Sequence, residues 1–383
     1  MNVLLVSSFV LPHTGGVEHF VARVREALEG RGWNCRVLAC RLRGGRTDAD
    51  ATLPTWFLPP AGWPLPIGGW RTLWREVGAA DVVVVNGTRH VLPALAAFAA
   101  RLRGKEALFV MHGSGAPLTG SWLYHGLLGS LFEWTLVRPV LRISRPVSVS
   151  RVGVDGARDR YGVHATHVPF PLPELPAAEG AGRLDGDSPL RVVWVGRLYP
   201  EKDPLQAVAA VESVRRRRPA TLELYGDGIL AARLEELARS RPWLAVHGTR
   251  SWDAIQEIQG RAHVCLSTSR REGAQLAVLE PMSRGVPVVC TRVGDAPRYY
   301  LDPALERFCV PPGDTDASAT AILELASSYK RYRDAFSENA KLLRTSHRDG
   351  IEAFASLIEA AARPRRVWSR WPLTPARLRG RSR

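Results

Sequence analysis

The chain has 383 residues, an apolar content of 45% and a formal net charge of +15 at pH 7. This length is typical of two α/β domains, and the apolar content gives each of them enough side chains for a buried core. The five cysteines lack the spacing of a zinc site, so we expect reduced thiols in a cytoplasmic protein. The apolar start of the chain has no basic segment before it and ends at Ser7-Ser8, which predicts a buried strand instead of a signal peptide.

The basic excess is concentrated at the C-terminal end, where residues 363–383 contain eight arginines, two tryptophans and no acidic residue. Such a charge suits an enzyme that binds diphosphates, a protein that visits an anionic membrane, or a nucleic-acid binder. The sequence carries no zinc-finger, RNA-recognition or helix-turn-helix signature, so we expect no nucleic-acid partner.

The predicted elements repeat one pattern in the two halves of the chain. Each half opens with an apolar strand, a loop that contains glycine and a helix. These elements are a strand at 1–6 with a helix at 17–29, and a strand at 190–195 with a helix at 205–215. Further short apolar strands are expected at 34–38, 81–85, 107–111, 146–150, 220–225, 244–246, 263–267, 286–290 and 307–310. Buried strands that alternate with helices predict the α/β class, with two Rossmann-like, doubly wound domains.

A segment rich in proline, glycine and alanine separates the halves and has no apolar period. We therefore expect an acceptor-side domain at 1–172, a linker at 173–189 and a donor-binding domain at 190–345. A helix at 346–362 is expected to return to the first domain, before the basic tail.

The segment Glu272 to Pro281 places two carboxylates eight residues apart. Glu272 is expected on a loop after a strand and Glu280 about two turns into a helix. The free amides at the start of that helix favour a phosphate, and the carboxylates can accept hydrogen bonds from sugar and ribose hydroxyls. The alternative is a helix with one acid near its positive end and a second acid on the surface.

Arg197 and Lys202 lie in the loop after the first strand of the second half. The carboxyl ends of parallel strands face the ligand crevice of a doubly wound sheet, so two cations there can bind a diphosphate. Two solvated loop cations are the alternative. Gly226-Asp227-Gly228 follows the next strand, where either a close backbone approach to a ligand or a plain turn explains the glycines.

Two positions in the first half are candidates to face the same ligand. Gly15-Gly16 precedes a helix start whose amides can meet a diphosphate. His112 follows the strand at 107–111 and can hydrogen-bond a sugar hydroxyl, with a structural histidine as the alternative.

Together these motifs resemble the GT-B-fold retaining glycosyltransferases of family 4, over roughly residues 1–362. The resemblance rests on Gly15-Gly16, His112, Val147-Ser148-Val149-Ser150 with Tyr161-Gly162, Gly196-Arg197 with Lys202, Gly226-Asp227-Gly228, and Glu272 with Glu280. It implies two Rossmann-like domains that face each other across a cleft.

The resemblance also implies a role for each matching position. Arg197 and Lys202 would neutralise the donor diphosphate, Glu272 and His112 would contact the transferred sugar, and Glu280 would hold the ribose. The remaining donor-binding positions would be Gly16, Gly196, Gly226, Gly228, Gly273, Ala274 and Leu276. No metal and no cofactor is implied, since the nucleotide sugar is a co-substrate and the cations replace Mg²⁺.

The chain departs from the family pattern at three places. Ala274-Gln275 stands where an aromatic residue and glycine are common, which bears on the choice of sugar. Val168 to Pro171 replaces a common Asn-Gly, which bears on hinge contacts to the donor. Asn86 stands where a histidine is frequent.

The expected reaction is transfer of a hexose or N-acetylhexosamine from a UDP- or GDP-sugar to a glycan or lipid-linked acceptor, with retention of configuration. A nucleotide-sugar epimerase of the same fold is the alternative enzyme. Residues 121–143 are apolar and aromatic but contain charges and Pro139, which favours an amphipathic helix over a spanning one. This segment and the basic tail are therefore candidates for peripheral contact with the inner face of the cytoplasmic membrane.

Overall fold

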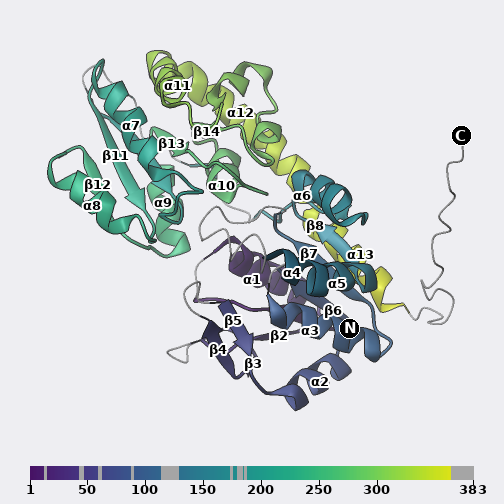
Figure 1. Ribbon diagram of the computed structural model, residues 1–383. Coiled ribbons are helices and arrows are strands. Elements are labelled where there is room, and N and C mark those ends of the chain that lie inside the picture. Colours follow the sequence, from purple (N-terminus) through teal and green to yellow (C-terminus); the bar gives the residue numbers. More distant parts are fainter. Residues whose placement is uncertain are drawn as a thin grey trace, which may run out of the picture.

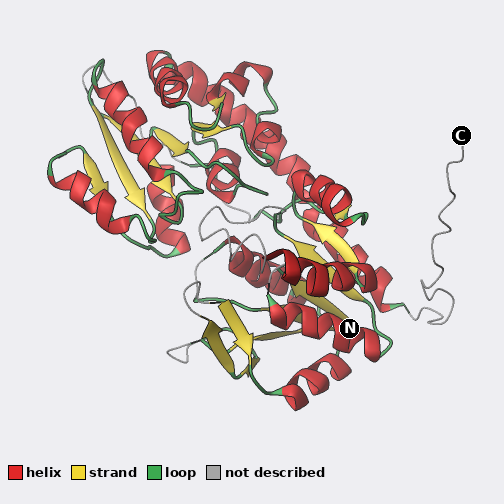
Figure 2. Cartoon of the chain, viewed as in Figure 1, coloured by secondary structure: helices red, strands yellow, loops and turns green. Residues whose placement is uncertain are grey.

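The computed structural model describes residues 1–12, 15–42, 47–58, 63–87, 90–113, 129–172, 176–178, 184 and 188–363 (Figure 1). It contains two parallel sheets, one in each half of the chain, and the prediction of two Rossmann-like α/β units is confirmed. Figure 2 shows helices against the strands of both halves.

The N-terminal sheet has seven strands in the order β3-β2-β1-β6-β7-β8-β9, all parallel. Its strands are β1 (Asn2–Ser7), β2 (Asn34–Cys40), β3 (Ala51–Leu53), β6 (Val82–Asn86), β7 (Ala107–Met111), β8 (Arg145–Ser148) and β9 (Thr166–His167). An antiparallel hairpin of β4 (Thr55–Leu58) and β5 (Trp63–Pro66) lies beside this sheet.

Successive residues of the central strand β1 point to opposite faces of this sheet, as the two-residue period of a strand requires. Val3 and Leu5 join the core that holds α1 (Gly16–Glu29) and α13 (Gly350–Ala362). Leu4 and Val6 join the core on the other face, which is covered by a second set of helices. These are α2 (Trp70–Ala79), α3 (Val91–Leu102), α4 (Gly129–Phe132), the π-helix η2 (Glu133–Val137) and α5 (Arg138–Ile143).

The C-terminal sheet has six parallel strands in the order β12-β11-β10-β13-β14-β15. They are β10 (Leu190–Val195), β11 (Ala220–Tyr225), β12 (Leu244–Val246), β13 (Val264–Ser267), β14 (Val288–Thr291) and β15 (Cys309–Val310). The helices are α7 (Pro204–Arg215), α8 (Ala231–Arg239), α9 (Trp252–Gly260), α10 (Leu276–Ser283), α11 (Thr315–Ser327), α12 (Tyr329–Arg348) and the 3₁₀ segments η4 (Ala296–Tyr299) and η5 (Pro303–Phe308).

The chain order reverses beside the first strand of each sheet. β1 lies between β2 and β6, and β10 lies between β11 and β13, so loops on the two sides of each strand lead in opposite directions. Such a switch point opens the carboxyl ends of the strands to a ligand.

Two contacts join chain segments that are far apart in sequence. The ring of Phe354 on α13 lies 5.6 Å from the ring of Phe20 on α1, and Arg31 forms an ion pair with Glu352. A described part of the interdomain segment is fixed to the C-terminal half, because the amide of Ala178 donates to the carbonyl of Arg284 at 2.9 Å.

All the predicted strands agree with the structure within two residues at each end, and the strand expected at 307–310 is the shortest of them in the structure. Only Cys309 and Val310 are extended, because residues 303–308 form a 3₁₀ segment in which Asp302 caps the amide of Ala304 at 2.9 Å. The strands β3, β4, β5 and β9 were not predicted.

Residues 121–128 and the tail at 364–383 lie outside the described residues, and no helix among those described is long and apolar enough to cross a membrane.

Two more helices lie among the described residues of the N-terminal half. They are α6 (Arg151–Gly156), whose N-cap is Ser150, and the π-helix η3 (Ala157–Tyr161).

Candidate active site

The loops after β10 and β13 lie side by side, since these strands are neighbours in the sheet. Lys202 from the first loop forms an ion pair with Oε1 of Glu272 from the second, and the Ser269 hydroxyl donates to the same oxygen at 2.7 Å. Thr268 ties the loops together, because its hydroxyl donates to the carbonyl of Asp203 at 2.7 Å. The structure therefore joins two predicted site residues that are 70 positions apart.

The backbone conformation of Asp203 explains the direction of the Lys202 side chain. Asp203 has φ +46°, in the left-handed region that aspartate tolerates better than most residues with a side chain. Its carboxylate caps α7 at the amide of Gln206 and accepts a 2.7 Å hydrogen bond from Arg270. This turn ends the loop and directs Lys202 toward Glu272.

Arg197 is not part of the Lys202–Glu272 pair. Its side chain is 64% exposed and donates to Glu201 at 3.2 Å, with the guanidinium 5.4 Å from the centre of the Tyr199 ring. The cation is therefore open to solvent at the rim of the loop, where a diphosphate can reach it.

The glycines of the second half are explained by loop packing. Gly226 and Gly228 have φ +144° and +156°. A Cβ on Gly226 would lie 1.9 Å from the carbonyl oxygen of Gly196, and one on Gly228 would lie 2.6 Å from that of Leu198. The β11 loop can therefore lie against the β10 loop only with glycine at both positions.

Glu280 is buried, and both of its carboxylate oxygens accept hydrogen bonds in the structure. Its Oε1 accepts hydrogen bonds from Arg23 at 2.7 Å and from the Trp252 indole at 3.3 Å, and its Oε2 accepts one from Gln256 at 3.0 Å. Because α10 begins at Leu276, Glu280 lies about one turn into the helix, and the expectation of two turns is wrong.

His112 from the N-terminal half borders the same region. Its Nε2 lies 3.3 Å from Oδ1 of Asn86, and its ring packs edge-on against Phe20 with centroids 4.9 Å apart. Burial lowers the pKa of His112 to about 4, so the imidazole is neutral at physiological pH. Because Oδ1 of Asn86 can only accept, Nε2 carries the proton, and Nδ1 is the nitrogen left to accept a hydrogen bond without carrying charge.

The two halves meet at backbone positions that were predicted from the sequence to bind the donor. A Cβ on Gly273 would lie 2.4 Å from the carbonyl oxygen of His112, and one on Gly16 would lie 3.1 Å from Cδ1 of Leu276. Ala274 is partly buried and packs against the buried core that residues of both halves form. The predicted positions in the two halves are thus adjacent in the structure.

Several residues at this junction were missed by the sequence analysis. Asp295 accepts hydrogen bonds from the amides of Arg151 at 2.7 Å and Val152 at 3.1 Å, at the start of α6. Arg23 lies over the Trp252 ring at 5.1 Å. The one available signal was that Arg23 follows the Gly15-Gly16 loop on α1, one turn after His19, whose ring also faces Trp252 at 6.2 Å.

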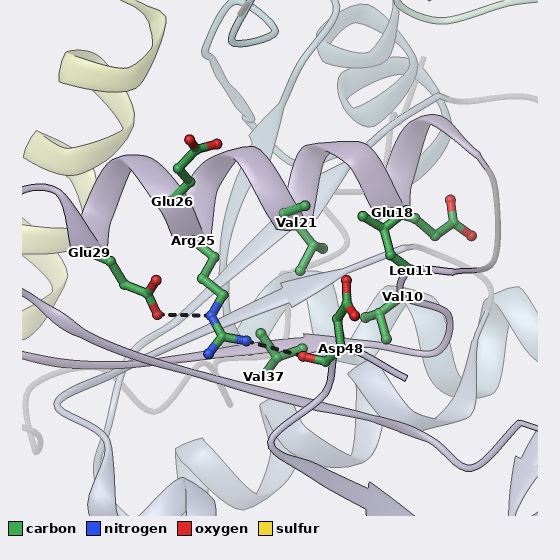
Figure 3. Close-up of a pocket in the computed structure, with 10 residues that line it drawn as sticks. Val10, Leu11, Glu18, Val21, Arg25, Glu26, Glu29, Val37 and Asp48 are labelled. Atoms are coloured by element: carbon green, nitrogen blue, oxygen red, sulfur yellow. Dashed lines mark hydrogen bonds and ion pairs between the residues drawn. The ribbon is translucent and has the colours of Figure 1, made fainter. Parts of the chain in front are cut away.

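A cavity of about 380 Å³ lies beside α1, and the residues around it are drawn in Figure 3. Arg25 donates to Glu29 at 2.9 Å and to the carbonyl of Asp48 at 3.1 Å across this cavity. Glu18 also lines it, and the Glu18 carboxylate lies beside Gly15. The cavity therefore begins next to the Gly15-Gly16 loop, but Glu272 and Glu280 are not among its lining residues.

The arrangement can bind a compact anion and a polyhydroxylated ligand. Lys202 and Arg197 supply cations at the carboxyl end of β10, and Glu272 supplies a carboxylate beside them. Within the described residues, no group of three or more histidine, cysteine or acidic side chains is arranged to hold a metal ion.

Two family models match the chain and together cover most of it. One described as Glycosyltransferase Family 4 matches residues 14–169, and one described as Glycosyl transferases group 1 matches residues 189–328.

Individual proteins show the same similarity. The chain is 30% identical over 158 residues to a sulfoquinovosyl transferase of Arabidopsis thaliana, covering 40% of this chain and 30% of that protein. It is 24% identical over 320 residues to one of the subunits of the phosphatidylinositol N-acetylglucosaminyltransferase of the same plant, covering 79% and 70%. It is 34% identical over 158 residues to a GDP-mannose-dependent phosphatidylinositol monomannoside mannosyltransferase of Mycolicibacterium smegmatis, covering 38% and 41%.

Solved structures match over nearly the whole chain. A sucrose-phosphate synthase from Thermosynechococcus elongatus has a TM-score of 0.71 at 17% identity, covering 94% of this chain and 98% of that one. A pneumococcal O-GlcNAc transferase in complex with UDP and GlcNAc also has a TM-score of 0.71, at 12% identity, covering 95% and 99%. At these identities the likeness establishes the GT-B fold.

Proposed function

The chain belongs to the glycosyltransferases of family 4, also described as glycosyl transferases group 1, and on that premise we propose that it is a nucleotide-sugar-dependent transferase. It moves a hexose or N-acetylhexosamine from a UDP- or GDP-sugar to a hydroxyl group of a glycan or lipid-linked acceptor. The configuration at the anomeric carbon is retained.

The Lys202–Glu272 pair beside Gly273 is the observation that carries this proposal. It places a cation and a carboxylate at a switch point of the sheet, next to the neutral His112 of the other half. A sugar diphosphate has the matching chemistry, since phosphate pairs with the cation and sugar hydroxyls donate to the carboxylate.

The donor contacts follow from these positions. Lys202 and Arg197 stabilise the diphosphate as negative charge develops on it during cleavage. Glu272 and His112 contact the transferred sugar, and Glu280 accepts hydrogen bonds from the ribose hydroxyls. The relatives named above include one described as GDP-mannose-dependent, and the pneumococcal structure contains UDP, which supports both bases as candidates.

The retained configuration follows from attack on the face of the sugar that the diphosphate leaves. The bond between the anomeric carbon and the phosphate oxygen breaks, and the acceptor oxygen forms a new bond to that carbon. The acceptor proton passes to the departing phosphate oxygen, so every atom and charge is accounted for. A covalent sugar adduct on the protein, found by mass spectrometry during turnover, would contradict this route.

A donor screen tests the proposal. Calorimetric binding of UDP-, GDP- and ADP-sugars is compared between the wild type, Glu280→Ala and Arg197→Ala. We expect one donor to bind the wild type and both variants to weaken it at least about tenfold, as the loss of a charge-assisted hydrogen bond predicts.

Two controls make the screen specific. Arg233→Ala removes an exposed cation of α8 that pairs with Glu236, and it should leave binding unchanged. Arg23→Met breaks the partner ion pair of Glu280 and separates a loss of the junction from a loss of the ribose contact. If folded wild type binds no nucleotide sugar, the proposal fails. If it binds one and converts it to an epimer without acceptor, the protein is an epimerase instead of a transferase.

A further inference from the structure

The face of the N-terminal sheet opposite α1 is covered by elements with an exposed aromatic surface. We call the β4–β5 hairpin, residues 67–69, α2, α3, Arg103 and the α4–η2–α5 helix the tryptophan layer. Ten large hydrophobic side chains are exposed among the described residues, and seven belong to this layer. The seven are Trp56, Ile67, Trp70, Trp74, Leu102, Leu131 and Trp134.

These elements form one continuous layer around α3, which packs against α2, β5, η2 and α5. The rings of Trp63 in the hairpin and Phe132 in α4 lie 5.8 Å apart and connect its two ends. Figure 1 shows the hairpin, α2 and α3 in the lower part of the molecule, away from the C-terminal sheet. The layer buries its inner side chains, such as Leu73 and Val140, on the sheet. The core on this face is therefore formed by other side chains of the layer, and the exposed tryptophans lie outside it.

The charge of this layer has one sign at the surface. Residues 55–58, 63–79, 91–103 and 129–143 contain six arginines and two glutamates. Both glutamates are buried and paired: Glu76 binds Arg36 and Arg75, and Glu133 binds Arg160. The described part of the layer therefore exposes arginine but no carboxylate.

The exposed cations and rings lie together. The guanidinium of Arg103 lies 4.2 Å from the centre of the Trp74 ring, and that of Arg138 lies 4.2 Å from the centre of the Trp134 ring. Arg71 and Arg142 are exposed on α2 and α5. Tryptophan is favoured at the boundary between lipid headgroups and acyl chains, and arginine is attracted to lipid phosphates.

We propose that the tryptophan layer docks the protein on an anionic lipid surface. The tryptophan rings enter the headgroup region, and the surrounding arginines pair with lipid phosphates. This mode of binding needs no spanning helix, since interfacial aromatic side chains and cations act together. A second copy of the chain is a poorer occupant, because two identical faces would bring arginine against arginine.

The test uses the full chain and lipid vesicles without donor or acceptor, so its outcome does not depend on the proposed activity. Wild type is sedimented with vesicles of phosphatidylcholine alone and with vesicles containing one third phosphatidylglycerol. We expect it to bind the anionic vesicles. A variant with Trp56, Trp70, Trp74 and Trp134 each changed to serine should bind them at least about tenfold more weakly.

Two further variants make the result decisive. The first is a triple variant of the C-terminal half with the substitutions Ile229→Ser, Leu301→Ser and Leu342→Ser. It removes exposed apolar residues outside the layer and should leave vesicle binding unchanged. Arg71→Gln, Arg103→Gln and Arg142→Gln keep the rings and should weaken binding and flatten its salt dependence. Thermal unfolding checks that each variant is folded.

Three results would overturn the proposal. The first is recovery of all the wild-type protein in the supernatant with anionic vesicles. The second is binding of both layer variants as tightly as wild type, which would assign binding to another segment such as the basic tail. The third is a wild-type dimer in sedimentation velocity that the tryptophan variant loses, which would assign the face to self-association.

Discussion

Arg23 on α1 and Glu280 on α10 form an ion pair of 2.7 Å between the two halves of the molecule, with side chains only 13% and 9% exposed. Arg23 also donates to the carbonyl of Pro171, and Glu280 accepts from Gln256 and Trp252. A desolvated pair of this kind is supported by its additional hydrogen bonds, and removing one partner leaves a buried charge. The carboxylate proposed to bind ribose is therefore also a structural link between the halves.

Breaking this link should destabilise the protein. We expect Arg23→Met and Glu280→Gln each to lower the free energy of unfolding by about 3 kcal/mol. The double variant should lose less than the two single losses together, by about 1–3 kcal/mol, because both substitutions remove the same contact. Denaturant unfolding of the four proteins measures this coupling.

The matched control is the exposed pair Arg233–Glu236 on α8. Its coupling should be below about 1 kcal/mol, since exposed ion pairs are screened by water. Equal coupling in both cycles would show that the contact between Arg23 and Glu280 contributes no more than a surface pair.

The Lys202–Glu272 pair leads to a prediction about catalysis. Lys202→Met removes the cation next to the proposed diphosphate, and we expect kcat to fall about 100-fold or more, as when a charge-stabilising group is deleted. Lys202→Arg keeps the charge and should recover part of this loss. Initial rates with the donor identified by the screen provide the measurement.

The corresponding control is Lys341→Met, which breaks an exposed pair with Glu338 on α12. It should leave the rate within about twofold, as expected for a surface substitution. Wild-type rates in Lys202→Met would remove this lysine from the proposed mechanism.

The sequence predicted strands best where an apolar run is bounded on both sides. Residues 190–195, 220–225 and 244–246 are strands with the predicted ends. The β4–β5 hairpin was missed because Pro64 and Pro66 argue against a strand, yet an isolated hairpin tolerates proline where no ladder hydrogen bond is needed.

The residues of the candidate site also differ in whether the sequence alone predicts them. Lys202 and Glu272 could be assigned to one site from the sequence, because both follow strands that end at one edge of a parallel sheet, and the structure adds the ion pair between them. Arg23, Trp252 and Asp295 could not, because each is brought to the junction by how the two halves pack and no local spacing reports that packing.

The contact between Gly273 and the His112 carbonyl predicts a steric effect. Gly273→Ala would place a Cβ 2.4 Å from that oxygen, so one backbone segment has to move. We expect stability to fall by about 1–3 kcal/mol, as overpacked sites do. Donor binding should weaken as well, because Glu272 precedes the displaced residue. Gly113→Ala is the control, since a Cβ there has no atom of the described residues within 4 Å and both quantities should remain unchanged.

The pH dependence of stability is expected to reflect His263 beside β13. Its Nδ1 accepts a hydrogen bond from the amide of Arg191 at 2.9 Å. Burial, reinforced by Arg191, Arg218 and Arg333, lowers the pKa of His263 from its ordinary value of 6.5 to about 4. Between these values the unfolded chain binds a proton that the folded chain does not, so this stability is present above pH 6.5 and lost as the pH falls to about 4.

At 1.36 kcal/mol per pKa unit, this shift corresponds to a loss of about 3 kcal/mol over that interval. His263→Gln keeps an acceptor for the Arg191 amide and has no titrating group, so its unfolding free energy should fall less steeply between pH 6.5 and 4. The slope should remain above zero, because burial lowers the pKa of His112 to about 4 as well. Tyr329→Phe changes the ring packed against His263 and keeps the imidazole, so it should parallel the wild type. Parallel curves for His263→Gln and wild type would show that His263 titrates alike in the folded and unfolded chains.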